Sequence, residues 1–190
     1  MRLYRVFYHL ANAPITAAGG ALYIPSQGAG RLDNPGVYKV LYLGDSAAGV
    51  VAEVFGRRYH WASKMFRGLP MLPGSAHALA TYEVPDQYAI CDLDDPHQLI
   101  EVELRPSRVI TRDYEVTQAW ALDLYRRGRW SGVRWWSYYD SRWMSIGLWD
   151  LTSIQCVEIV SLTLEHPAVV EASSVLGRVI GTRALKERKT

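Results

Sequence analysis

The chain has 190 residues, 49% of them hydrophobic and 21% charged, which is ordinary for one globular domain with a hydrophobic core. Its formal net charge of +2 is too small to indicate binding to nucleic acid or to an anionic membrane. Two cysteines exclude a cysteine-rich disulfide framework, and no apolar run approaches the roughly 18 residues of a membrane span.

The first third of the chain predicts two strands and a helix. Residues 3–10 and 37–43 have the density of Tyr, Val, Leu and Phe that strands favour. Between them, residues 11–35 are small, glycine-rich and turn-like. Asp45 or Ser46 offers an N-cap for a helix over residues 47–59, which has apolar side chains at helical spacing.

The middle of the chain predicts a loop, a strand pair and two helices. Residues 61–75 contain two prolines and two glycines, which indicates a loop that is either a lid or a surface connection. Residues 78–84 and 88–93 are expected to pair as strands. Asp95-Pro96 opens a short helix, and residues 114–127 form a longer amphipathic helix ended by Gly128.

The last third predicts strands over residues 132–139, 145–149 and 158–164, followed by a helix over residues 167–176 with proline in its first turn. Strands and helices are mixed without a regular βαβ rhythm. We therefore expect an α+β fold, a compact single domain with a mixed, largely antiparallel sheet core flanked by helices.

We expect residues 1–180 to form this domain and residues 181–190 to be a polar tail. The glycine-rich loops of Rossmann and P-loop proteins are missing from the sequence, which argues against those nucleotide sites. The histidines have no ligand-like spacing, so no metal site is predicted. The N-terminus lacks the apolar stretch of a secretory signal, and we expect a cytoplasmic protein with no membrane contact.

Three side chains with useful chemistry follow one another in the predicted turn–strand–helix unit. Arg31 lies in a turn, where its guanidinium matches two phosphate oxygens or is simply solvated. Tyr42 lies near the end of a strand, where it stacks on a ligand ring or packs in the core. Glu53 borders an apolar stripe, where we expect it to be partly buried. It points into a polar pocket or pairs with Arg57 on the surface.

A fourth candidate, Ser137, lies within an aromatic strand and either donates a hydrogen bond into a pocket or faces solvent. No histidine is placed to activate its hydroxyl, so we do not expect a serine nucleophile.

At these residues the chain resembles the RES domain family, which is named for its arginine, glutamate and serine. The 11-residue steps from Arg31 to Tyr42 and from Tyr42 to Glu53 fit the family. The other matching motifs are Leu3-Tyr4-Arg5, Gly30-Arg31, Val40-Leu41-Tyr42-Leu43, the Ala47–Val54 helix and the Gly132–Ser137 strand. The resemblance covers residues 3–164 and is most distinctive in the first third of the chain.

The resemblance implies a fold related to the ADP-ribosyltransferases and an enzyme that degrades NAD at its nicotinamide–ribose bond. Hydrolysis and phosphorolysis both occur in the family, so water or phosphate is the implied acceptor. NAD is then the substrate, and no separate cofactor is implied. Many members are toxins of toxin–antitoxin pairs, which implies an Xre-like helix-turn-helix antitoxin as partner.

Carried over residue by residue, the resemblance implies that Glu53 acts at the ribose and that Tyr42 stacks on the nicotinamide. Arg31, together with Arg5, would hold the phosphates or a ribose. Ser137 would complete the pocket, and an alternative alignment places the family serine at Thr117.

Two other functions stay open. The same fold could transfer ADP-ribose to a protein, or the chain could be a non-catalytic binding module. In the second case, the aromatic and basic segments 61–67 and 126–136 would suit single-stranded nucleic acid. The sequence leaves the oligomeric state open, a homo-oligomer included.

Overall fold

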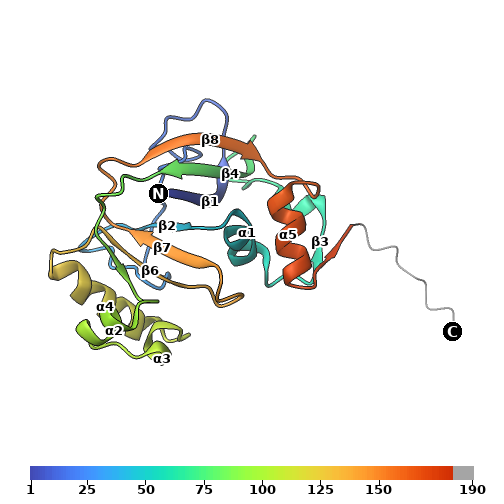
Figure 1. The fold of residues 1–190 in the computed structure, drawn as a ribbon. Helices are drawn as coiled ribbons and strands as arrows, with labels where there is room; N and C mark the ends of the chain where they lie inside the picture. Colours follow the sequence, from blue (N-terminus) through green and yellow to red (C-terminus); the bar gives the residue numbers. More distant parts are fainter. Residues whose placement is uncertain (182–190) are drawn as a thin grey trace.

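The computed structural model describes residues 1–181, and a seven-stranded sheet forms its centre (Figure 1). The strands of this sheet are β1 (Arg2–His9), β2 (Leu41–Gly44), β4 (Ala76–Glu83), β5 (Ile90–Asp92), β6 (Gly132–Trp136), β7 (Met144–Leu148) and β8 (Gln155–Ser161). Their order is β5-β6-β7-β2-β1-β4-β8, and every neighbouring pair is antiparallel except β5 and β6. The sheet is therefore mixed and largely antiparallel, and the predicted α+β class is confirmed.

The remaining elements lie on or beside this sheet. They are α1 (Ala47–Phe55), the 3₁₀ helix η1 (Ser63–Phe66), α2 (Pro96–Glu101), α3 (Pro106–Val109), α4 (Tyr114–Arg126), α5 (Pro167–Val175) and the short parallel pair β3 (His60–Trp61) and β9 (Val179–Ile180). The helix α1 packs against α5, whereas α2, α3 and α4 gather near β6 (Figure 1).

Side chains alternate between the two faces of the sheet, as the strand period requires. One face carries an apolar core closed over by the loop that follows β1. Its largest buried members are Leu3, Leu41, Tyr82, Ile146 and Leu148. The opposite face carries two further cores, one under α1 and α5 and the other under α4. The two groups of helices thus share one face of the sheet.

The sequence of α1 explains both its position and its length. Ser46 caps the helix, since its hydroxyl oxygen accepts a hydrogen bond from the Gly49 N–H at 3.1 Å. Val51 and Phe55 are buried in the core beneath the helix. The helix ends at Phe55, four residues before the predicted end, because the chain then turns to form β3 beside β9.

The second strand is shorter than predicted because a side chain replaces a neighbouring strand. The amide of Gln27 accepts from the Val40 N–H at 2.8 Å and donates to the Val40 carbonyl at 2.7 Å. The strand ladder therefore begins only at Leu41. A buried backbone unit needs both partners, and here one glutamine supplies them.

Two other expectations about connections were wrong. Strand β5 pairs with β6 rather than with β4, because α2, α3 and α4 bring the chain back to the β5 edge. The segment 61–75 is neither a lid nor only a surface connection. Trp61, Met65 and Phe66 are buried in the core under α1.

The structure adds α3, η1, β3 and β9, which the sequence did not predict. Residues 182–190, most of the expected polar tail, lie outside the described residues. Within residues 1–181, no helix has the length and apolar character needed to cross a membrane.

We expect Gln27→Leu to lower the free energy of unfolding by about 1–3 kcal/mol, because the buried N–H and carbonyl of Val40 lose their partners. Urea denaturation monitored by tryptophan fluorescence measures this change. Gln155→Leu, on the exposed face of the edge strand β8, is the matched control. Equal stability of the two variants would contradict a structural role for Gln27.

Candidate functional site

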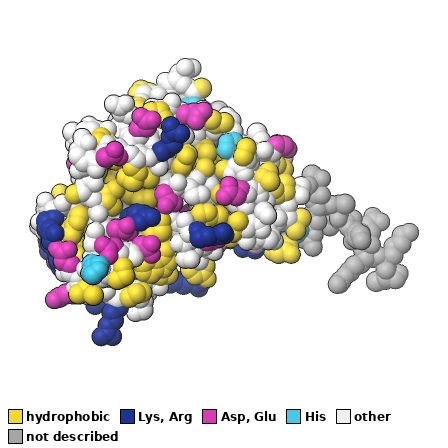
Figure 2. Space-filling view, viewed as in Figure 1, with side chains coloured by type: hydrophobic (Ala, Val, Ile, Leu, Met, Phe, Trp, Pro, Cys, Tyr) yellow, Lys and Arg dark blue, Asp and Glu magenta, His cyan; other side chains and the backbone are white. Residues whose placement is uncertain are grey.

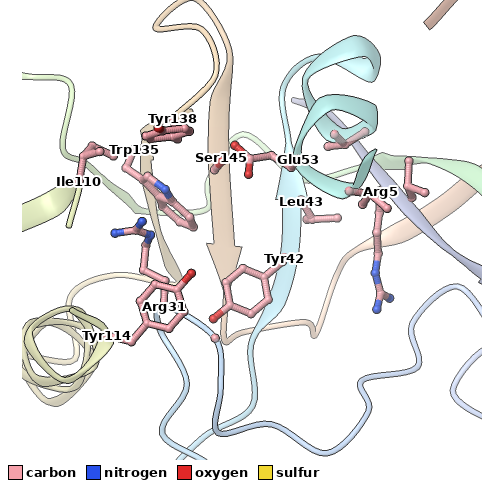
Figure 3. Close-up of a pocket in the computed structure, with 14 residues that line it drawn as sticks. Arg5, Arg31, Tyr42, Leu43, Glu53, Ile110, Tyr114, Trp135, Tyr138 and Ser145 are labelled. Atoms are coloured by element: carbon pink, nitrogen blue, oxygen red, sulfur yellow. The ribbon is translucent and has the colours of Figure 1, made fainter. Parts of the chain in front are cut away.

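A cavity of about 440 Å³ opens on the sheet face that carries the helices (Figure 3). Its walls come from α1, α4, the 28–34 turn and the strands β1, β2, β6 and β7. The lining residues are Arg5, Val6, Gly30, Arg31, Tyr42, Leu43, Val50, Glu53, Val54, Ile110, Tyr114, Trp135, Tyr138 and Ser145. The three candidate side chains of the turn–strand–helix unit, Arg31, Tyr42 and Glu53, thus line one cavity. The fourth candidate, Ser137, does not line it.

Glu53 projects from the second turn of α1 into this cavity. The Ser137 hydroxyl donates a hydrogen bond of 2.5 Å to its Oε1 atom, and the Tyr139 N–H donates to the Ser137 oxygen at 3.1 Å. Ser137, one residue beyond β6, is buried, whereas Glu53 is exposed rather than partly buried as expected. Of the two environments considered for Glu53, the structure places it in the pocket, with Ser137 instead of Arg57 as its partner.

Arg31 occupies the opposite wall of the cavity from Glu53 (Figure 3). Its Nη1 atom donates to the Val109 carbonyl at 2.5 Å, and the guanidinium lies 5.7 Å from the centre of the Tyr114 ring. Burial lowers the pKa of Arg31, and nearby Tyr114 and Glu53 oppose this shift. The group remains a cation, because arginine does not lose its proton in proteins.

The turn that carries Arg31 is built around the buried carboxylate of Asp33. Its Oδ2 atom accepts from the N–H groups of Gly28 and Gly30 at 2.8 and 2.7 Å, and its Oδ1 atom accepts from the Tyr42 hydroxyl at 2.7 Å. A Cβ atom on Gly30 would lie 2.7 Å from both Asp33 Oδ1 and the Tyr42 oxygen, so only glycine fits. Asp33 thereby joins the turn to β2.

The helix α4 holds the same turn from the other side. The Thr117 hydroxyl donates to the Arg31 carbonyl at 2.6 Å, and the Gln118 side-chain amide donates to the Gly30 carbonyl at 2.8 Å. The Asn34 amide donates to the Gln118 carbonyl at 3.0 Å. Thr117 is fully buried and does not line the cavity. Of the two candidates for the family serine, Ser137 is the one that contacts Glu53.

Tyr42 presents its ring to the cavity while its hydroxyl is fully engaged. The hydroxyl donates to Asp33 and accepts from the Leu32 N–H at 2.9 Å. Burial, and then the hydrogen bond to Asp33, raise the pKa of Tyr42 well above its ordinary value. The ring face, and not the phenol, is therefore what Tyr42 offers to a ligand.

The guanidinium of Arg5, a predicted ligand of the phosphates or a ribose, is hydrogen-bonded to backbone carbonyls. It shares its strand face with Leu3 and Phe7, whose side chains pack in the core on the far side of the sheet. Its Nη1 atom donates to the carbonyls of Ala21 and Tyr23, both at 3.0 Å, and burial lowers its pKa. Although Arg5 borders the cavity, its guanidinium points away from the other lining side chains (Figure 3).

Sequence reasoning missed Asp33 and the aromatic side chains Tyr114, Trp135 and Tyr138. Strand alternation offers a signal for one of them, since Trp135 is two residues before Ser137 in the chain. Tyr114 and Tyr138 lie in segments that only the fold brings to one cavity, and the role of Asp33 depends on its hydrogen bond with Tyr42. Within residues 1–181, no group of three His, Cys, Asp or Glu side chains is arranged to hold a metal ion.

The family model of the RES domain matches residues 2–170. A search of curated proteins found no match. Among solved structures, the chain is similar to one in the crystal structure of the M. tuberculosis MbcT–MbcA toxin–antitoxin complex. The TM-score is 0.57 and the sequence identity 18%, over 93% of this chain and 88% of that chain, so the two share a fold.

We expect Tyr42→Phe to lower the free energy of unfolding by about 1–3 kcal/mol at neutral pH, since Asp33 loses a donor and Leu32 an acceptor. The raised pKa of Tyr42 adds a pH dependence. The neutral phenol contributes its full stability below pH 10, the ordinary value, and this contribution is lost as the pH rises towards the folded-state pKa.

Urea denaturation from about pH 8 to about pH 11 measures both effects. Wild type should lose stability above pH 10 more steeply than Tyr42→Phe. Tyr59→Phe, at a residue that is 62% exposed, is the control and should follow wild type. Parallel curves for Tyr42→Phe and wild type would contradict the proton linkage.

Proposed function

The chain belongs to the RES domain family, and from this premise we propose that it cleaves NAD at the bond between nicotinamide and ribose. The observation that carries the proposal is the placement of Glu53. A carboxylate oriented by Ser137 faces the cavity, and the cation Arg31 lies on the opposite wall. This arrangement suits NAD. The ribose at its reacting end develops positive charge, which a carboxylate stabilises, and its diphosphate is an anion, which an arginine binds.

Cleavage of this bond does not require a strong general acid. When the C1′–N bond breaks, its electron pair goes to the nicotinamide ring nitrogen, which leaves as a neutral ring. The ribose is left with oxocarbenium character, which a nearby carboxylate stabilises electrostatically. In the proposal Glu53 does this, with its Oε1 atom held by Ser137. A water or phosphate oxygen then bonds to C1′, and in hydrolysis the water proton passes to solvent.

Aromatic rings supply the walls for the nicotinamide. Tyr42 and Trp135 line the cavity, and the engaged hydroxyl of Tyr42 leaves only its ring face available. We assign Tyr42 to stacking on the nicotinamide and Arg31 to the phosphate nearest the nicotinamide ribose. Tyr114, within cation–π distance of Arg31, keeps that guanidinium directed along the wall.

For the biological role we propose a toxin of a toxin–antitoxin pair, acting on cytoplasmic NAD and restrained by a helix-turn-helix antitoxin. The fold shared with a chain of the MbcT–MbcA complex supports this role. Basic and acidic side chains are interspersed on the face shown in Figure 2, which favours this proposal over a module that binds nucleic acid.

We expect purified wild-type protein to release nicotinamide from NAD, and Glu53→Gln to lower kcat by about 100-fold or more with little change in KM. The substitution keeps the size and the hydrogen-bonding oxygen but removes the charge that faces the ribose. Chromatographic measurement of nicotinamide, with and without phosphate, gives both constants. A phosphorylated ADP-ribose product would identify phosphate as the acceptor.

Glu165→Gln, an exposed glutamate outside the cavity, is the matched control and should keep wild-type turnover. Expression in cells should deplete NAD and stop growth with wild type but not with Glu53→Gln. Absence of nicotinamide release by folded wild type in both buffers would overturn the proposal. Release only when a protein acceptor is added would instead assign ADP-ribosyl transfer.

A further inference from the structure

A wider groove of about 1180 Å³ continues outward from the cavity. The two spaces share the lining residues Arg31, Glu53, Val54, Ile110, Tyr114 and Tyr138. The groove adds Arg57, Arg112 and Arg178, none of which borders the inner cavity. A ligand that reaches Glu53 can therefore extend without interruption past three more cations.

These arginines come from three separate segments of the chain. Arg57 follows the end of α1, Arg112 lies between α3 and α4, and Arg178 lies between α5 and β9. Among the described residues that line the groove, Glu53 is the only carboxylate. Arg31, which lines both spaces, is a fourth cation of the groove. The groove thus brings four arginines together with one carboxylate, and none of the four forms an ion pair within residues 1–181.

Local contacts direct two of these guanidinium groups, those of Arg178 and Arg112. The Nε and Nη2 atoms of Arg178 donate to the Gly56 carbonyl at 3.1 and 2.8 Å, which leaves its other N–H groups available. Arg112 lies 5.8 Å from the centre of the Tyr138 ring, at the junction between cavity and groove. A guanidinium held in a fixed direction presents a planar pair of donors, the geometry that phosphate oxygens accept.

We propose that this arginine groove binds the diphosphate and the second nucleoside of a nicotinamide dinucleotide whose nicotinamide end occupies the cavity. The inference rests on the proposed function and adds to it the residues that hold the ADP part of the substrate and select for it. The protein should select dinucleotides over nicotinamide mononucleotide, which has the same scissile bond but lacks the second nucleotide. Arg57, Arg112 and Arg178 are then specificity-determining residues outside the reacting centre.

The test compares nicotinamide release from NAD and from nicotinamide mononucleotide. The double variant Arg57→Gln/Arg112→Gln should lower the ratio of the two kcat/KM values by at least about tenfold, through a higher KM for NAD. Arg178 is left unchanged because its hydrogen bonds to Gly56 also support the fold. Arg2→Gln/Arg126→Gln removes the same charge from exposed sites outside the groove and should keep the wild-type ratio.

A binding measurement separates this inference from the proposed function. Calorimetric titration with ADP-ribose needs no turnover, and the double variant should bind at least about tenfold more weakly than wild type. If wild type releases no nicotinamide from either substrate, the proposed function fails while the titration still decides the groove. An unchanged kcat/KM ratio, equal ADP-ribose affinity of the two proteins, or no ADP-ribose binding by wild type would overturn the inference.

Discussion

The buried carboxylate of Asp33 is the constraint on which the geometry of the site depends. A carboxylate removed from water costs several kcal/mol unless hydrogen bonds replace its hydration. Here the replacements are two N–H groups of its own turn and the hydroxyl of Tyr42 on β2. Because the donors come from both turn and strand, the carboxylate is satisfied only while the two remain in contact. That contact sets the place from which Arg31 enters the cavity.

Separate sets of contacts position the two charged walls of the cavity, one with Arg31 and the other with Glu53. Arg31 belongs to a turn that β2 holds through Asp33 and that α4 holds through Thr117 and Gln118. Glu53 belongs to α1, whose buried face packs on the core shared with α5. The sheet connects the two systems and fixes the width of the space between them. A change in the packing of α4 or of α1 would therefore alter the distance between Arg31 and Glu53 without any change to these two residues.

Local patterns in the sequence predict most of the elements but not their neighbours. The spacing of apolar residues locates β1, α4 and α5 closely, because each element has its own N-cap or alternation. The partner of β5 could not be predicted, since it depends on where α2 to α4 return the chain. The early end of the β2 ladder depends on Gln27, thirteen residues from the backbone unit it satisfies. Such a contact leaves no periodic pattern in the sequence.

In the candidate site, too, the residue chemistry could be predicted from the sequence, whereas the contacts between segments could not. The chemistry of Arg31, Tyr42 and Glu53 could be expected from residue type and local setting, and the structure brings all three to one cavity. Asp33 could not be expected, because an aspartate in a turn is usually solvated and its buried role requires Tyr42 from another segment. Alternation along β1 groups Arg5 with Leu3 and Phe7, yet only the folded sheet shows that the cavity lies on the other face.

The hydrogen bond from Ser137 to Glu53 bears on the charges of both the cavity and the groove, because Glu53 lines both. Glu53 and Arg57 are one helical turn apart, a spacing at which opposite charges commonly pair. Ser137 instead donates a hydrogen bond to the carboxylate of Glu53, which lines the cavity. Arg57 then remains in the groove with Arg112 and Arg178. One neutral hydroxyl is thus the hydrogen-bond partner of Glu53, and Arg57 forms no ion pair within residues 1–181.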